Sequence, residues 1–128
     1  MADMITKTDF KSKKNVLLAP HLAFEIGVQV SNTGVSTTNG KKIIPAGTPI
    51  GATTSVLSKR DTVLSVTNNS STGANAQGIL RDDLDVTNGN ANGTMVVSGV
   101  IDESKCPTID NTVKTALPHI IFVNGGKY

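Results

Sequence analysis

The sequence predicts a mainly β fold: a small β-barrel or sandwich-like domain with one short C-terminal helix and a flexible N-terminal arm. Three observations lead to this prediction. They are short runs of β-branched residues, turns rich in glycine and asparagine between those runs, and one segment in which apolar and polar residues alternate. The 128 residues suit one domain. We expect the arm over residues 1–15 and a single β-rich domain over residues 16–128.

The composition predicts a core of aliphatic side chains. Hydrophobic residues make up 38% of the chain, yet it has no Trp, one Tyr and three Phe. The single cysteine, Cys106, excludes an internal disulfide and suits a reducing compartment. No apolar run approaches the roughly 20 residues of a membrane span, so we expect no membrane partner. The polar, charged start of the chain is unlike a secretory signal.

The first fourteen residues carry the excess charge of the whole chain. Their charged side chains sum to +2 and are Lys7, Lys11, Lys13, Lys14, Asp3 and Asp9. The rest of the chain holds eight basic and eight acidic side chains. A basic arm can contact an acidic surface of protein, nucleic acid or membrane. By charge alone, a solvated and frayed terminus is the better interpretation.

The clearest expected strand spans residues 24–30, after a short apolar run at residues 16–18 that Pro20 stops. Its apolar residues alternate with polar or small ones, as in a half-buried strand; they are Phe24, Ile26, Val28 and Val30. Residues 31–42 then form a polar turn region. Within it, Asn39-Gly40 supplies the positive φ angles that a tight hairpin needs.

Residues 43–51 begin with two isoleucines and continue into a proline- and glycine-bearing turn. Pro45 and Pro49 each fix φ and lack a backbone N–H donor. We therefore expect this segment at a sheet edge or corner and not as a central strand.

Further strands are expected where β-branched and other apolar residues cluster, at residues 62–67, 76–80, 94–101 and 120–123. Asn88-Gly89 and Asn92-Gly93 predict a glycine-rich connection before the strand at residues 94–101. Asp110 predicts the N-cap of a short helix over residues 111–116, which Pro118 ends. The expected total is five or six short strands and one small helix, without an internal repeat or a second domain.

The only acidic cluster of the expected domain does not predict a metal site. Asp83, Asp85 and Thr87 resemble the start of a calcium loop. However, Asn88 and Thr94 stand where such a loop requires glycine and glutamate. A solvent-facing turn whose aspartates accept backbone N–H bonds is the better interpretation.

The other reactive side chains are isolated in the sequence. His21 and His119 have no cysteine or acidic residue at ligand spacing. Cys106 lies beside Lys105 but has no nearby histidine, which favours a structural thiol. Residues 125–127 (GGK) lack the other positions of a phosphate loop. We expect no enzyme activity, cofactor or metal, and the scarce aromatics argue against a nucleic-acid partner.

Three glycine-bearing segments, in a fixed order, carry a family resemblance. They are P-A-G-T-x-x-G at residues 45–51, G-I-L-x-D-D-x-D-V-T at residues 78–87 and G-T-x-V-V-x-G-V-I at residues 93–101. A turn at residues 102–107 and a helix-then-strand segment at residues 114–122 follow. In this order and spacing, the chain resembles the lambda-type head decoration (capsid-stabilising) proteins of tailed bacteriophages. The resemblance covers roughly residues 43–123.

The resemblance implies a capsid cement protein of the virion. Such proteins bind the major capsid protein as homotrimeric knobs on the outer surface of the expanded head, after assembly in the host cytoplasm, and stabilise it against internal DNA pressure. Their N-terminal arm orders on the capsid and can add a strand to a capsid sheet. In this chain the capsid-binding residues would be Ile5, Thr6, Lys7, Thr8, Phe10, Lys11, Lys13 and Lys14. The arm departs from the family by its many lysines and by the long N-terminal part that follows it.

Two other classes of function compete with capsid decoration. One is a β-rich phage tail, fibre or surface module that binds carbohydrate or a host surface. Such modules usually line their sites with exposed aromatic side chains, which are scarce here. The other is a small enzyme, which ranks last because no acid–base pair or activated nucleophile can be assembled from the sequence.

Overall fold

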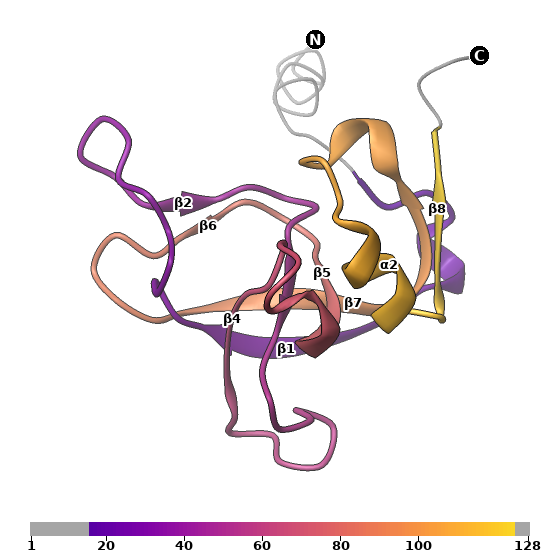
Figure 1. The fold of residues 1–128 in the computed structure, drawn as a ribbon, viewed down its shortest axis with the longest axis horizontal. Helices are drawn as coiled ribbons and strands as arrows, with labels where there is room; N and C mark the ends of the chain where they lie inside the picture. Colours follow the sequence, from indigo (N-terminus) through magenta and orange to yellow (C-terminus); the bar gives the residue numbers. More distant parts are fainter. Residues whose placement is uncertain (1–15, 125–128) are drawn as a thin grey trace, which may run out of the picture.

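The structure is a computed structural model that describes residues 16–124, and within them the fold is mainly β (Figure 1). One sheet has the strand order β1-β4-β3-β5-β7-β8, and a further pairing of β1 with β7 closes the first five strands into a barrel. Its strands are β1 (Phe24–Val30), β3 (Pro49–Gly51), β4 (Val63–Val66), β5 (Ala76–Leu80), β7 (Ala91–Asp102) and β8 (Ile120–Val123). A two-stranded sheet pairs β2 (Ile43–Ile44) with β6 (Leu84–Asp85). The predicted β-barrel class is thus confirmed.

Short helices fill the connections between the strands. They are the 3-10 helices η1 (Pro20–Leu22), η2 (Gly73–Asn75) and η3 (Glu103–Lys105) and the α-helix α2 (Asn111–Ala116). The predicted cap of α2 is present, because the Asp110 side chain accepts a hydrogen bond from the Thr112 N–H at 2.9 Å. No helix within residues 16–124 has the length and apolar character needed to cross a membrane.

Strand β1 follows the predicted alternation in its second half only. Val28 and Val30 are buried, whereas Phe24 is 54% exposed. At Phe24 the register against β7 shifts, because Phe24 pairs with Ser98 while Glu25 pairs with Val96. Such a bulge redirects the strand, so Phe24 lies outside the barrel core.

The expectation that residues 43–51 avoid a central strand is wrong. Strand β3 lies inside the sheet, where Ile50 pairs with Val66 of β4 and with Gly78 of β5. Pro49 is tolerated because it is the first residue of the strand, a position at which a missing N–H breaks no ladder. Its carbonyl still accepts a hydrogen bond from the Thr67 N–H at 3.0 Å.

Of the two Asn-Gly turns predicted in the second half of the chain, one is present and the other is part of a strand. Gly89 has φ of 125° in the loop before β7, as a turn requires. Asn92 and Gly93, in contrast, belong to β7 and pair with Gln29 and Val28 of β1. In the earlier hairpin, Asn39 (φ 54°) and Gly40 (φ 78°) adopt the expected conformation between the paired Thr38 and Lys41.

Two hydrophobic clusters lie on opposite faces of β5 and β7, because neighbouring residues of a strand point to opposite faces. The inner cluster fills the barrel and consists of Val28, Val30, Ile44, Ile50, Val56, Leu64, Leu80, Val86 and Met95. The outer cluster lies between the sheet and α2 and consists of Val16, Leu17, Ala46, Ala76, Ile79, Val96, Ile101, Ile109, Val113, Leu117 and Ile120. Both clusters are aliphatic, as the composition predicts.

Candidate functional site

The arm residues predicted to bind a partner lie outside the described residues. These are Ile5, Thr6, Lys7, Thr8, Phe10, Lys11, Lys13 and Lys14. The first residues that the structure describes are hydrogen-bonded to strand β7. The Val16 carbonyl accepts a hydrogen bond from the Asp102 N–H at 2.7 Å, and the Leu18 N–H donates to the Val100 carbonyl at 3.0 Å. Residues 16–18 thus lie antiparallel to the last residues of β7.

The other described chain end lies on the opposite edge of the same strand. Strand β8 runs parallel to β7, with Val123 in register with Asp102. Residues 16–18 occupy one edge of β7 and β8 occupies the other. Val16 and Val123 therefore lie at the same end of β7 (Figure 1). Within residues 16–124, β8 pairs with β7 alone, and its Ile121 is 59% exposed.

Asp102 fixes this end of β7. Its carboxylate is 2% exposed and accepts hydrogen bonds from the backbone N–H of Ser104 at 3.1 Å and the hydroxyl of Ser104 at 2.5 Å. These bonds cap η3, and the Lys105 ammonium lies 3.9 Å from the second carboxylate oxygen. A buried, hydrogen-bonded side chain therefore fixes the end of β7 at which Val16 and Val123 lie.

The acidic cluster at residues 82–85 has a local structural role. The Asp83 carboxylate accepts a hydrogen bond from the Ala46 N–H at 2.7 Å. Asp85 accepts one from the Thr87 N–H at 2.9 Å. The hydroxyl and the N–H of Thr87 hold the pKa of the Asp85 carboxyl below its ordinary value of 3.8. These contacts match the predicted turn in which aspartates accept backbone N–H bonds.

Among residues 16–124, no group of three or more potential ligands could hold a metal ion. The Cys106 thiol donates to the Asp102 carbonyl at 3.4 Å and packs beside Gly47. A side chain at Gly47 would meet this sulfur, so the thiol fills space between the residue 45–51 turn and η3.

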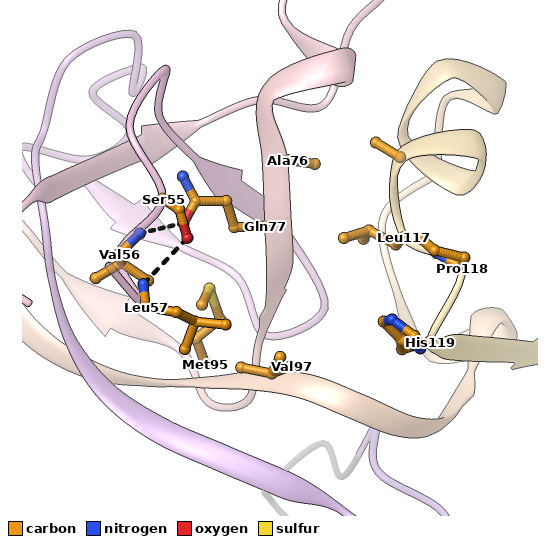
Figure 2. Close-up of a pocket in the computed structure, with 11 residues that line it drawn as sticks. Ser55, Val56, Leu57, Ala76, Gln77, Met95, Val97, Leu117, Pro118 and His119 are labelled. Atoms are coloured by element: carbon orange, nitrogen blue, oxygen red, sulfur yellow. Dashed lines mark hydrogen bonds between the residues drawn. The ribbon is translucent and has the colours of Figure 1, made fainter. Parts of the chain in front are cut away.

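An apolar groove of about 180 Å³ lies at one end of the barrel (Figure 2). Leu57, Met95 and Val97 lie on one side of it and Leu117, Pro118 and His119 on the other. Its lining contains no Asp, Glu, Lys or Arg. Such a groove can accept an apolar side chain, and its serine and histidine, Ser55 and His119, lie on opposite sides of it (Figure 2).

Gln77 holds one wall of this groove in place. Its amide nitrogen donates to the carbonyls of Ala52 at 3.0 Å and Thr54 at 2.7 Å, and its amide oxygen accepts from the Val56 N–H at 2.8 Å. These bonds fix the loop that presents Leu57, which is 55% exposed. The sequence did not reveal the groove, because its walls come from segments far apart in the chain.

No protein-family model and no curated protein matches the chain.

Proposed function

We propose that this protein is a capsid decoration protein, which binds the outer surface of an expanded phage head and stabilises it against internal DNA pressure. The observation that carries the proposal is the ordered series of segments at residues 45–51, 78–87 and 93–101. These segments supply β3, part of β5 and most of β7, which are neighbours in the barrel. The resemblance thus rests on one contiguous part of the fold and not on scattered turns.

The contact with the major capsid protein is assigned to residues 1–14 of the arm. The first described residue, Val16, accepts a hydrogen bond from the Asp102 N–H at the end of β7. Strand addition binds through backbone hydrogen bonds, so it suits an arm of undistinguished sequence. Three arms in a homotrimer would bind together, and avidity would then replace one deep binding pocket.

Deletion of residues 2–14 tests this assignment. The truncated protein should keep its fold and its self-association but lose binding to expanded shells of the major capsid protein of the same phage. Occupancy is measured by co-sedimentation and electron microscopy, with folding checked by circular dichroism. A control with Lys59→Gln and Arg60→Gln, in the loop between β3 and β4, should decorate shells like the wild type. Undiminished decoration by the truncated protein would show that the arm is not the binding element.

A further inference from the structure

We infer that Asn39, at the tip of the hairpin between β1 and β2, is a site of spontaneous deamidation, at which the side-chain amide is converted to an acid. Water is the co-reactant and ammonia is released. The inference is independent of the proposed function, because the reaction takes place within the chain itself and involves no partner.

The chemistry of an Asn-Gly pair makes its asparagine reactive. The backbone nitrogen of the glycine loses its proton and attacks the side-chain amide carbon of the asparagine. A new C–N bond forms, the C–NH2 bond breaks, and the amide nitrogen takes up the proton and leaves as ammonia. Water then opens the resulting cyclic imide at either carbonyl, which gives aspartate or isoaspartate. Glycine favours the attack because it has no side chain and leaves the backbone free to rotate.

Three Asn-Gly pairs lie within residues 16–124, at residues 39–40, 88–89 and 92–93. The two reacting residues are the same in each pair, so the structure around them decides how easily the glycine nitrogen reaches the asparagine side chain. The pairs lie in a hairpin tip, in an anchored turn and in a strand. The fold thus places the same chemical group under three degrees of restraint.

The pair in the hairpin tip is the least restrained. Asn39 and Gly40 are both exposed and have φ of 54° and 78°. Two backbone hydrogen bonds close the hairpin, from the Thr38 N–H to the Lys41 carbonyl at 2.8 Å and from the Lys41 N–H to the Thr38 carbonyl at 3.0 Å. Neither bond uses the Gly40 nitrogen, which is the nucleophile. Among the described residues, none beyond the chain neighbours lies within 4 Å of a Cβ added at Gly40, so water reaches this peptide.

The pair at residues 88–89 is held in an anchored turn. The Gly89 N–H donates a hydrogen bond to the Val86 carbonyl at 3.1 Å, and this bond must break before the nitrogen can attack. Val86 is fully buried, and its own N–H donates to the Lys42 carbonyl at 2.8 Å. Since the turn begins at a fixed residue, we expect Asn88 to react more slowly than Asn39.

The pair at residues 92–93 is the most restrained, because it belongs to β7. Gly93 pairs with Val28 of β1, and the Leu84 side chain would lie 3.2 Å from a Cβ added at Gly93. An extended chain held by a neighbouring strand cannot turn the glycine nitrogen towards the preceding side chain without leaving that strand. Opening a sheet costs more free energy than opening a loop tip, so Asn92 should react most slowly.

Deamidation would change the hairpin in two ways. Either product adds a negative charge at position 39, two residues before the exposed Lys41. Isoaspartate also lengthens the backbone path by one carbon, so the bonds between Thr38 and Lys41 could no longer close around a two-residue loop. An aged copy of the protein would therefore differ from a new one in the charge and the shape of this hairpin.

Peptide mapping by mass spectrometry tests the ranking of the three pairs. The full-length protein is kept folded in warm, mildly alkaline buffer made with heavy-oxygen water, and acid formation is followed at each pair. Asn39 should convert at least about tenfold faster than Asn92, with Asn88 between them. Heavy oxygen in the product shows that the acid formed by hydrolysis during the incubation. Equal rates at Asn39 and Asn92, or a faster reaction at Asn88 than at Asn39, would overturn the inference.

The same measurement in urea separates the effect of structure from that of sequence. In the unfolded chain the three pairs should convert at rates within about threefold of each other. A ranking that persists in urea would assign the reactivity to the flanking residues and overturn the inference. In the folded protein, Asn39→Gln should remove the first acidic form seen on ion exchange, whereas the matched variant Asn92→Gln should leave it. An acidic form that survives Asn39→Gln would also refute the assignment.

Discussion

The inner and outer hydrophobic clusters share the strands β5 and β7 but are closed in different ways. The inner cluster is enclosed by a complete circuit of paired strands. The outer cluster is covered by α2, β8 and the residues that follow the arm, Val16 and Leu17. Backbone pairing thus protects the first, whereas short segments near the two chain ends protect the second.

This difference separates a rigid part of the molecule from an adaptable one. A closed barrel has few ways to relax when one of its residues changes, because each strand is held on both edges. Helix α2 lies outside the strand pairings and is packed against the sheet by its side chains, so it can shift by small amounts.

The largest expected effect comes from Gly51→Ala, which tests the closure of the barrel. A Cβ atom at Gly51 would overlap the Asn75 carbonyl oxygen, so β3 and β5 could not keep their spacing. We expect a loss of about 3 kcal/mol in the free energy of unfolding, measured by urea denaturation. Gly27→Ala in β1 is the matched control, since no atom lies within 4 Å of its added Cβ. Equal losses for the two variants would contradict the proposed crowding.

A smaller effect is expected from one substitution in each cluster. Val30 (inner) and Val113 (outer) are both fully buried. Val30→Ala should lower the free energy of unfolding by about 2.5 kcal/mol and Val113→Ala by about 1.5 kcal/mol, because α2 can move to fill part of the space. Chemical denaturation of both variants gives the comparison. A larger loss at Val113 would show that the outer cluster is the more rigid one.

The smallest effect concerns the exposed carboxylate of Asp85 in the β2–β6 sheet. Its pKa is lowered in the folded state, so its stabilising contribution is present above pH 3.8 and is lost as the pH falls through the folded-state pKa. Thr87→Val should raise the pKa of Asp85 towards the ordinary value, since the hydroxyl of Thr87 is the largest cause of the shift. Carboxyl NMR titration measures this change.

A second carboxylate serves as the internal control for that titration. The pKa of Asp61 is also lowered, mainly by a hydrogen bond from Lys59 and by its charge. Thr87→Val should leave Asp61 unchanged. If both pKa values move together, the cause is a general change in the fold and not the local bond to Thr87.

Local chemistry explains which parts of the fold could be predicted. The cap at Asp110, the hairpin at Asn39-Gly40 and the strand at residues 24–30 depend on neighbouring residues, and all three are present. The central position of β3 depends on a partner strand 25 or more residues away, which no local pattern indicates. Gly93 carries a turn signal, but its pairing with Val28 places it in β7 instead.

The candidate sites show the same limit. The charge of the arm can be read from the sequence, but the position of Val16 and Val123 at the same end of β7 depends on the pairing of β7 with residues 16–18 and with β8. The groove requires Leu57 and His119, which are 62 positions apart in the sequence, to lie on opposite sides of one hollow. Gln77 fixes the side of the groove that carries Leu57 through hydrogen bonds with Thr54 and Val56, which lie more than twenty positions earlier in the sequence.

The arrangement around β7 has a mechanical consequence. A pull on either chain end, directed away from the body, acts along the axis of the strand that bears it. The hydrogen bonds of residues 16–18 and of β8 to β7 are then loaded together in shear, whereas a sideways pull would open them one at a time. Tension on either end of the described chain would thus pass into β7, the longest described strand of the barrel.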